Sequence, residues 1–509
     1  MSFDANRPDL TVGVVGAGAM GRGIVQVAAA GGMTVRVTDS RPGAAQEARD
    51  FVGKMLARAA EKGSMTQDAV AAALNRITVV NSPADMKPCH VVIEAIVENL
   101  DAKRQLFAEL ETIVSPDCIL VTNTSSLSVT TIAAKLKSPQ RFAGFHFFNP
   151  VPLMKLVEVI DGLLTENWVS EALMVIGRRM TREPVRCTDA PGFLVNQVGR
   201  GFTLEAAHLA YEGIAGFVDV DRVMRDVCGF RMGPFELMEL TGLDVTQPAS
   251  VLIYNQFFQE PRYRPNLIMQ SRYEAGVLGR KTKKGFYEYD AEMKPIVAPE
   301  AAPPVAYPGH VWVSPADPQG HKVLTELLTK IGAKLETGPK PSASALILVT
   351  PVGEDATTCA VEQELDPKRT VAVDTLFPMV KRRTIMTTPV TDHVYRNAAH
   401  GLLASDGVPV TICRDSPGFI AQRIVAMIVN IGCSIAQSRT GQPADIDKAV
   451  TLGLNYPNGP FRFGELLGPQ RVHQVLASMH RIYGDPRYRP NIWLTRRARL
   501  GVSLLTPEL

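Results

Sequence analysis

The stretch TVGVVGAGAMGRG at residues 11–23 decides the fold of the first part of this chain. The apolar run Thr11–Val15 is typical of a buried strand, GAGAMG at 16–21 has the form GxGxxG, and Met20–Ala30 shows helical spacing. A strand, a glycine turn and a helix in this order are typical of the unit with which an α/β sheet binds a dinucleotide. We therefore predict a dinucleotide-binding domain at the start of the sequence.

Each part of this glycine loop has a role in that interpretation. Gly16 allows the tight turn, Gly18 lets a pyrophosphate approach the backbone, and Gly21 permits close packing of helix on strand. The free N–H groups that begin the helix, with its partial positive charge, would hold the phosphates. The residues expected to surround the cofactor are Gly16, Ala17, Gly18, Ala19, Met20 and Gly21.

The second strand-like run, Thr34–Thr38, leads to a carboxylate that bears on the choice of cofactor. Asp39 follows it, eighteen residues beyond Gly21. There a carboxylate would accept hydrogen bonds from both ribose hydroxyls and repel a 2′-phosphate, which favours NAD over NADP. Arg41 is the nearby residue that would favour NADP instead.

Strand-like and helical segments alternate through the first 160 residues. The further strand candidates are His90–Ala95, Cys118–Asn123 and Phe142–Phe148. The further helical candidates are Ala44–Glu61, Ala102–Ile113 and Val129–Leu136. Such alternation, with strands that are apolar almost throughout, predicts a doubly wound, mostly parallel sheet, the α/β Rossmann fold.

After Thr188 the sequence becomes helical. Pro191 is expected at the first helical position, and Gly213 is the predicted stop. The apolar residues that fall on one face of this helix are Leu194, Val198, Phe202, Ala206 and Leu209. An all-α domain is therefore predicted to follow the sheet domain.

An internal repeat extends this layout to the whole chain. TDAPGFLVNQV at 188–198 returns as RDSPGFIAQRI at 414–424, MGPFELMEL at 232–240 as NGPFRFGEL at 458–466, and PRYRPN occurs at 261–266 and 486–491. The offsets are 226, 226 and 225 residues, so the helical module is duplicated. A segment rich in proline and alanine, APEAAPPVAYP at 298–308, is typical of a linker between the halves. The predicted domains are an NAD-binding Rossmann domain at 1–187, a helical domain at 188–290, a linker at 291–310, a degenerate Rossmann-like domain at 311–405 and a second helical domain at 406–509.

Composition sets the broad class. Of 509 residues, 46% are hydrophobic and 21% charged, and the net charge is +3. These values favour neither nucleic acid nor a membrane surface as a partner. The opening residues lack the pattern of a secretory signal, and no apolar run of about 18 residues occurs. The most apolar candidate, Phe419–Ala436, contains Gln422, Arg423 and Asn430 and is predicted to be a buried or partner-facing helix.

Cysteine and histidine usage adds two expectations. The seven cysteines are scattered without a CxxC pair, which favours reduced core thiols in a cytoplasmic protein. The nine histidines form no cluster with metal-ligand spacing, so no metal site is expected.

The segment after the fifth predicted strand carries the candidate catalytic pair. In RFAGFHFFNPVPLMKLVEV at 141–159, His146 lies near the end of a strand, where parallel sheets place their ligands. His146 and Glu158 are equally spaced about Pro152, so a hairpin-like return would bring imidazole and carboxylate together. Such a pair makes a general base, in which the imidazole accepts the proton and the carboxylate fixes its tautomer. A hydrogen-bonded core histidine is the alternative that these residues alone leave open.

Four strings in one order point to a family. They are EAIVENL at 94–100, NTSSL at 123–127, HFFNP at 146–150 and PGFLVN at 191–196. Together they resemble the L-3-hydroxyacyl-CoA dehydrogenases of β-oxidation, over about residues 8–290. The two-copy layout is similar to that of bacterial members of this family, including those associated with phenylacetate degradation.

The resemblance implies oxidation of an (S)-3-hydroxyacyl-CoA thioester to the 3-oxoacyl-CoA, with NAD as the cofactor. It implies that His146 is the base, that Glu158 orients it, and that Ser125 and Asn196 complete the site around the substrate oxygen. The positions implied to contact NAD are Glu98, Lys103, Ser125, Asn149 and Lys281. Those implied to contact CoA are Lys62 and Ser125, while Met55 stands where the family has a second CoA-contacting serine.

Some of these residues have a purely structural alternative. Glu98 and Lys103 could form an exposed helical pair, Ser125 could cap a helix, and Lys62 could be a solvated lysine. Asn196 is harder to explain in this way, because a buried amide on an apolar helix face needs hydrogen-bond partners.

Residues 311–405 are predicted to be a degenerate copy of the sheet domain. Val311–Val313 and Leu346–Thr350 are its strand candidates, but no GxGxxG follows the first. TIMTTP at 384–389 would correspond to FHFFNP, which puts Ile385 in the histidine's place.

Gln422 takes the place of the active-site asparagine in the second helical module. The second copy is therefore expected to catalyse nothing. It could form a pseudo-dimer with the first copy within one chain, or it could shape the acyl pocket. Assembly of several chains into a homo-oligomer is a further alternative.

The main hypothesis is thus an NAD-dependent 3-hydroxyacyl-CoA dehydrogenase. A specialist for 3-hydroxybutyryl-CoA or 3-hydroxyadipyl-CoA is one alternative, and a non-catalytic NAD-binding scaffold is another. Retention of His146, Glu158, Ser125 and Asn196 together argues against the scaffold. A fused hydratase is excluded, because dehydrogenase-like modules take up the sequence from residue 8 onward.

Overall fold

The structure is a computed structural model that describes residues 3–305, 307 and 309–508. It divides into two compact units, Met1–Asn196 with Ser438–Leu454, and Gln197–Gln437 with Asn455–Leu509. The predicted linker at 291–310 includes positions 306 and 308, which lie outside the described residues. Its described residues before His310 form neither a helix nor a strand.

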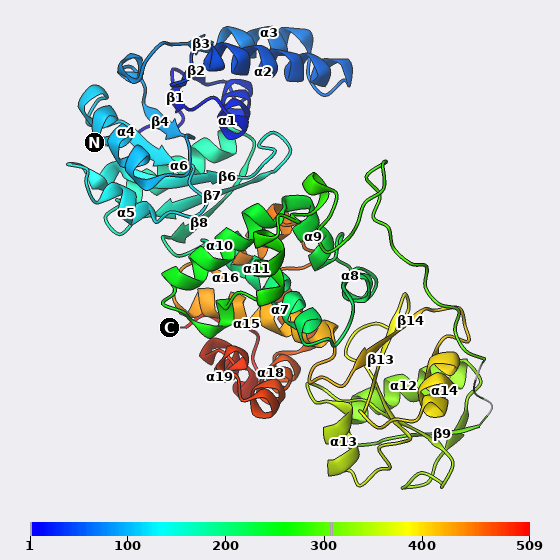
Figure 1. Ribbon diagram of the computed structural model, residues 1–509. Coiled ribbons are helices and arrows are strands. Elements are labelled where there is room, and N and C mark those ends of the chain that lie inside the picture. Colours follow the sequence, from blue (N-terminus) through cyan, green and yellow to red (C-terminus); the bar gives the residue numbers. More distant parts are fainter. Residues whose placement is uncertain (1–2, 306, 308, 509) are drawn as a thin grey trace. The chain divides into compact units, whose positions relative to one another are not determined.

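Eight strands form the sheet of the first unit, in the order β3-β2-β1-β4-β5-β6-β7-β8 (Figure 1, blue to cyan). Neighbours from β3 to β6 are parallel, β7 is antiparallel to β6, and β8 is parallel to β7. The strands are β1 (Thr11–Val15), β2 (Thr34–Thr38), β3 (Ile77–Val79), β4 (Val91–Glu94), β5 (Ile119–Thr122), β6 (Phe142–Phe147), β7 (Leu156–Asp161) and β8 (Glu183–Thr188). The predicted mostly parallel, Rossmann-like sheet is confirmed.

Helices cover both faces of this sheet. They are α1 (Ala19–Ala30), α2 (Ala44–Glu61), α3 (Gln67–Asn75), α4 (Leu100–Ile113), α5 (Val129–Ala133), α6 (Asn167–Arg179) and, from far along the chain, α16 (Pro443–Gly453). Side chains of α1, α2 and α6 share one core with alternate residues of β1 to β7. On α4, Phe107 packs edge-on against Phe142 of β6. The alternation of strands and helices therefore buries the sheet on both sides.

Side chains near the ends of the helices fix where some of them begin. The Asn99 side chain accepts a hydrogen bond from Ala102 N–H at 2.9 Å, which caps α4. Asp189 accepts from the Ser128 hydroxyl at 2.7 Å and from Thr130 N–H at 2.8 Å at the start of α5. These caps hold the loops at the carboxyl ends of β4 and β5, where the predicted cofactor residues lie.

The second unit contains a smaller sheet of six strands, in the order β10-β9-β11-β12-β13-β14. They are β9 (His310–Val313), β10 (Lys334–Glu336), β11 (Leu346–Val349), β12 (Thr370–Val373), β13 (Arg383–Thr387) and β14 (Val410–Arg414). The strands β12 and β13 are antiparallel, and the other neighbours are parallel. The accompanying helices are α12 (Pro318–Lys330), α13 (Ala356–Glu362) and α14 (His393–Leu403). A second sheet domain is therefore present, as the repeat predicts.

The remaining helices form the helical modules. They are α7 (Val195–Tyr211), α8 (Phe217–Asp226), α9 (Pro234–Thr241), α10 (Leu243–Gln256), α11 (Leu267–Glu274), α15 (Ala421–Gln437), α17 (Pro460–Leu467), α18 (Pro469–Tyr483) and α19 (Ile492–Leu500). The predicted start of the first helix at Pro191 is wrong, since α7 begins at Val195 after two residues with positive φ, Gly192 and Phe193. The predicted burial of the apolar segment now seen as α15 is confirmed.

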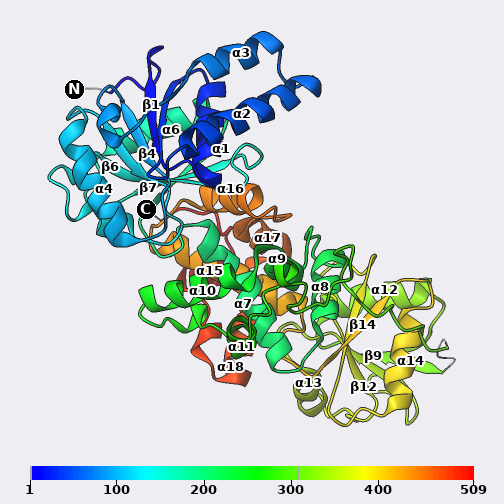
Figure 2. The same ribbon diagram turned by 45° about the horizontal axis from the view of Figure 1, so that its top comes forward.

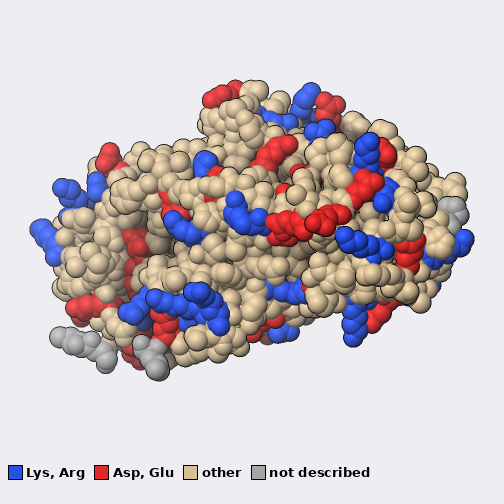
Figure 3. Space-filling model, turned by 90° about the horizontal axis from the view of Figure 1, so that it is seen from below, with Lys and Arg blue, Asp and Glu red and all other residues tan. Residues whose placement is uncertain are grey.

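Basic and acidic side chains are interspersed on the face drawn in Figure 3, as the small net charge suggests. All seven cysteines belong to the described part of the chain, where they are buried and lie outside any disulfide bond. Among the described residues, no helix combines the length and the apolar composition that crossing a bilayer requires.

Candidate active site

The three glycines of the loop between β1 and α1 have three different surroundings. Gly16 has φ +104°, and a Cβ there would meet the Ala95 carbonyl at 2.5 Å. A Cβ on Gly21 would collide with the Gly16 carbonyl. Gly18 caps α1, and a Cβ on it would meet no atom within 4 Å. Two glycines thus close the turn, whereas the third leaves open space before the free N–H groups of α1.

A cavity of about 720 Å³ opens beside this loop, lined by the ends of β1, β2 and β4 and by α4. Asp39 lines it and accepts hydrogen bonds from Ala17 N–H at 2.6 Å and Arg41 N–H at 2.8 Å. The Arg41 guanidinium turns to Glu47 at 2.6 Å. A carboxylate, free N–H groups and a concave wall therefore lie where a dinucleotide's ribose and phosphates would bind.

Glu98 organises the loop that carries Ser125. Its Oε1 accepts from the Thr124 hydroxyl at 2.6 Å, from Ser125 N–H at 3.0 Å and from the Ser126 hydroxyl at 2.8 Å. Burial raises the pKa of Glu98, but the nearby Lys103 ammonium and these donors outweigh it and leave that pKa below its ordinary value. The Ser125 side chain itself is exposed. Glu98 thus holds the loop from Thr124 to Ser126 at the rim of the site.

Lys103 lies beneath this loop, with only 1% of its side chain exposed. Its ammonium pairs with Glu94 at 2.6 Å and with Glu98 at 3.3 Å. Glu94 is fully buried and also accepts from the Thr122 hydroxyl at 2.6 Å. Sequence reasoning missed Glu94, although a carboxylate that ends an apolar strand is a signal for such a site. The alternative that Glu98 and Lys103 form an exposed helical pair is therefore wrong, because Lys103 is buried.

His146 and Glu158 face each other across the antiparallel pair of β6 and β7. The distance from His146 Nδ1 to Glu158 Oε2 is 2.7 Å, so the spacing about Pro152 brings the two together as predicted. His146 is 5% exposed and lies beside the rings of Phe148 and Phe193. Since Nδ1 is engaged by the carboxylate, Nε2 is the nitrogen left to accept a proton.

The start of α7 holds the other oxygen of Glu158. Its Oε1 accepts from Leu194 N–H and Val195 N–H, both at 3.0 Å, which are free donors because they begin the helix. Asn196 follows in the first turn, and its amide nitrogen lies 3.5 Å from the Ser125 carbonyl. The Gly192–Phe193 turn therefore delivers both the donors for Glu158 and the Asn196 amide to one place.

The other predicted contact residues lie on other segments of the chain. Asn149 is exposed in the loop after β6, before a cis proline. Lys62 is exposed at the end of α2, and Met55 lies on the same helix. Lys281 belongs to the second unit, where it pairs with Asp244 at 2.6 Å.

The strand registers identify the counterpart of His146 in the second sheet. Thr387 pairs with Arg414 on β13 and β14 as Asp161 pairs with Thr188 on β7 and β8, at the repeat offset of 226. Glu158 therefore corresponds to Thr384. The prediction that Ile385 replaces the histidine is wrong, because β13 corresponds to β7 and not to β6.

Asp374 holds the position of His146. It follows β12, the counterpart of β6, and its N–H donates to the Thr384 carbonyl at 3.0 Å. DTLFP at 374–378 thus aligns with HFFNP at 146–150, and the second copy has lost two residues between these strands. Ile385, the residue predicted for this place, lies eleven residues further along the chain, in the next strand β13.

The side chains at the second site differ from those at the first. Gln422 donates to Asp374 Oδ1 at 2.9 Å and accepts from Gly353 N–H at 2.8 Å. Burial raises the pKa of Asp374 to about 6. The second copy has a carboxyl group where the first has an imidazole, and a threonine where the first has a carboxylate.

Comparison with known proteins assigns the class. The model described as the NAD binding domain of 3-hydroxyacyl-CoA dehydrogenase matches residues 11–190. The model of the C-terminal domain of the same family matches twice, at residues 192–289 and 418–503. The chain belongs to the 3-hydroxyacyl-CoA dehydrogenase family and is an NAD-dependent enzyme of that class.

Individual relatives agree with this assignment. A 3-hydroxyadipyl-CoA dehydrogenase of Escherichia coli is 36% identical over 490 residues, which cover 96% of this chain and 98% of that protein. A probable 3-hydroxybutyryl-CoA dehydrogenase of Bacillus subtilis is 40% identical over 54% of this chain and 96% of its own length. The crystal structure of a 3-hydroxybutyryl-CoA dehydrogenase from Escherichia coli superposes with a TM-score of 0.84 at 34% identity, covering 97% of this chain and 99% of that one. The similarity to the two proteins of Escherichia coli thus spans both halves of this chain.

Proposed function

We propose that the first copy oxidises the 3-hydroxyl of a short (S)-3-hydroxyacyl-CoA to the 3-oxo group at the His146–Glu158 pair. The observation that carries this proposal is the buried 2.7 Å contact between His146 Nδ1 and Glu158 Oε2, which leaves Nε2 as a base. Bound NAD supplies the acceptor for the hydride that leaves C3. His146 Nε2 takes the hydroxyl proton, so that a C=O bond replaces the C–H and O–H bonds.

The surrounding residues act by position and charge. The Glu158 carboxylate, held by two backbone N–H groups, keeps the imidazole in one tautomer and stabilises the imidazolium after proton transfer. Phe148 and Phe193 limit access of water to the ring. We assign to Ser125 and Asn196 the donors that face the substrate oxygen as charge develops on it. Gly16 to Gly21 and Asp39 would hold the cofactor.

Relatives that span the chain are named for two short substrates, 3-hydroxyadipyl-CoA and 3-hydroxybutyryl-CoA, and we propose this range. The test is NADH formation with 3-hydroxybutyryl-CoA, longer straight chains and 3-hydroxyadipyl-CoA, each with its (R)-enantiomer as the control. We expect turnover of the (S) esters, with the highest kcat/KM at the short or dicarboxylic end. NAD binding without NADH formation from any ester would favour a non-catalytic scaffold instead.

Asp39→Ala is expected to relax the preference for NAD over NADP. The substitution removes two charge-assisted ribose contacts, each worth about 1.5–3 kcal/mol, together with the repulsion of a 2′-phosphate. The ratio of kcat/KM with NADP to that with NAD should rise by roughly tenfold or more. Asp50→Ala, on the exposed side of α2, is the matched control and should leave the ratio unchanged. An unaltered ratio in Asp39→Ala would mean that this carboxylate does not face the ribose.

We also propose that the second copy is catalytically degenerate. The absence of GxGxxG after β9 and the Asp374–Gln422 pair support this. One active site and one NAD per chain are expected.

A further inference from the structure

The last strands of the first sheet are contacted by a segment from the second half of the chain. Residues 438–454, which include α16, belong to the first compact unit, and α16 packs on β7 and β8. Thr188 N–H donates to the Thr440 carbonyl at 2.9 Å, and Cys187 forms a β-bridge with Gly441. Figure 2 shows α16, in orange, beside the cyan strands. The second helical module therefore supplies part of the wall around the first sheet.

Two glycines let this segment come close to the residues that hold Glu158. A Cβ on Gly453 would lie 2.9 Å from Leu156 Cδ2 and 3.1 Å from Val195 Cγ2. A Cβ on Gly441 would lie 2.8 Å from Leu194 Cδ2. A methyl group added at either glycine would force these neighbouring side chains to move, because all three distances are below those of ordinary contacts.

The contacted residues are the immediate support of the catalytic pair. Leu194 and Val195 are the residues whose N–H groups donate to Glu158 Oε1. Leu156 lies on β7 two residues before Glu158, so both side chains are on the same face of the strand. A displacement of this support would lengthen the hydrogen bonds that fix Glu158 and, through it, His146.

The repeat provides an internal comparison. The helix α8 corresponds to α16 at the 226-residue offset, and Arg414 N–H donates to the Ile214 carbonyl at 2.9 Å as Thr188 does to Thr440. We call the contact of α16 with β7 and β8 the first seam, and the corresponding contact of the α8 region with β13 and β14 the second seam. At the second seam, Arg382 has the position that Leu156 has at the first, and it pairs with Asp226 at 2.8 Å. Val227 replaces Gly453.

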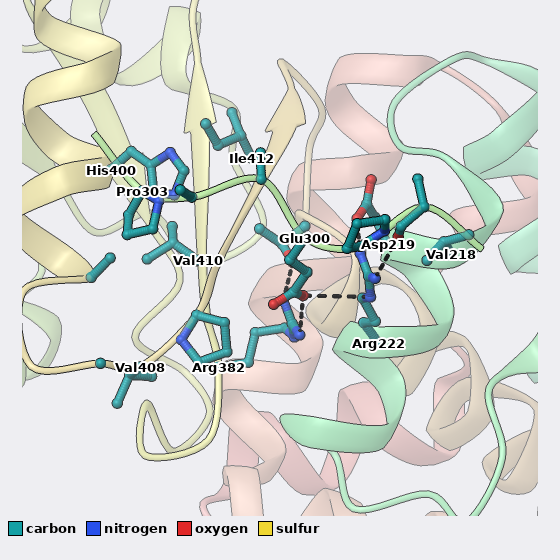
Figure 4. Close-up of a pocket in the computed structure, with 18 of the residues that line it drawn as sticks. Val218, Asp219, Arg222, Glu300, Pro303, Arg382, His400, Val408, Val410 and Ile412 are labelled. Carbon is teal, nitrogen blue, oxygen red and sulfur yellow. Dashed lines mark hydrogen bonds and ion pairs between the residues drawn. The ribbon is translucent and has the colours of Figure 1, made fainter.

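The second seam differs in a further way, because it contains a cavity. A cavity of about 690 Å³ opens between α8, the segment 297–303 and β14. Figure 4 shows Glu300 of that segment between Arg222 and Arg382, with which it forms ion pairs. The seam at α16, beside the His146–Glu158 pair, is instead formed by glycine against leucine and valine.

We infer that α16 is a positioning element of the active site. Gly453 and Gly441 press it onto Leu156, Leu194 and Val195 and thereby hold Glu158 against His146. The inference rests on the proposed role of His146, and it gives the non-catalytic copy a function in the reaction of the first.

Gly453→Val in the full-length enzyme is the test. We expect kcat to fall by roughly 10–100-fold, the cost of misplacing a catalytic group by about 1 Å, with an unchanged Kd for NAD. Val227→Leu adds bulk at the corresponding position of α8 and should leave kcat unchanged. Leu156→Ala combined with Gly453→Val vacates the space and should restore part of the loss. Gly453→Ala, a single methyl probe, serves if the valine variant does not fold.

Activity in a His146→Ala background separates positioning from general damage. There Gly453→Val should cause no further loss, because it acts only through the pair that is already broken. An equal loss in both backgrounds, or a Gly453→Val enzyme with wild-type kcat, would overturn the inference. If His146→Ala itself retains wild-type turnover, the proposed function fails and not the positioning role alone.

Discussion

His146→Ala is expected to lower kcat/KM for the (S)-3-hydroxyacyl-CoA by roughly 10²–10⁴-fold, the usual contribution of a positioned general base. The loss should appear in kcat, because proton transfer to Nε2 occurs only as the hydride leaves. NAD binding should be unchanged, since the loop from Gly16 to Gly21 and Asp39 lie on other elements of the sheet. Steady-state NADH formation and a direct titration of NAD binding measure the two quantities separately.

Two further variants sharpen this experiment. His393→Ala removes an exposed imidazole at the start of α14 and should leave kcat/KM unchanged. Glu158→Gln should lower kcat, yet add nothing in the His146→Ala background, because Glu158 acts through the imidazole. The proposed base would be disproved by a His146→Ala enzyme that binds NAD and turns over at the wild-type rate.

Local sequence patterns predicted several elements of the first sheet domain. The bounds of β1, β2 and α2 agree with the predicted ranges, because near-continuous apolar runs and helical periodicity are local signals. The pairing of His146 with Glu158 was also predictable, since the register of a strand pair is set by the spacing on either side of its turn.

What the sequence concealed depends on contacts between distant segments. The burial of Lys103 follows from Glu94, which approaches it only when β4 and α4 pack together. The place of α16 against β7 and β8 joins residues more than 250 positions apart, which no periodicity reveals. The position of Asp374 was hidden because TIMTTP at 384–389 resembles FHFFNP, although its strand β13 pairs with β12 and so corresponds to β7.

Arg423→Leu is expected to lower the free energy of unfolding of the second unit by about 3–5 kcal/mol, the usual cost of breaking a buried ion pair from one side. The Arg423 side chain is fully buried in α15 and pairs with Glu205 of α7, which is also fully buried. Its guanidinium binds both oxygens of Glu212 at 2.8 Å and donates to the hydroxyls of Tyr483 and Tyr488 at 2.7 and 2.6 Å. Urea unfolding and hydrogen exchange of the α7 and α15 amides measure the loss.

Glu205 explains why the loss should be large and how it should depend on pH. Burial would raise the pKa of Glu205, but Arg487 and Arg423 outweigh it and lower that pKa to about 2. A lowered folded-state pKa contributes stability above the ordinary value of 4.5, and that stability is lost as the pH falls toward 2. Without Arg423 the pKa of Glu205 rises, so the stability difference between the wild type and Arg423→Leu should be largest above pH 4.5 and should shrink as the pH falls toward 2.

The repeat supplies the matched control for this substitution. Gln197 of α7 occupies the position that Arg423 has in α15, and its amide donates to the Tyr263 hydroxyl at 2.7 Å. Gln197→Leu removes a neutral hydrogen bond and should cost only about 1 kcal/mol. Equal losses in Gln197→Leu and Arg423→Leu would show that helix packing, rather than the charge network, carries the stability. A large difference would mean that the charge network between Arg423 of α15 and Glu205 of α7 carries the stability, and that the equivalent position Gln197 contributes only a neutral hydrogen bond.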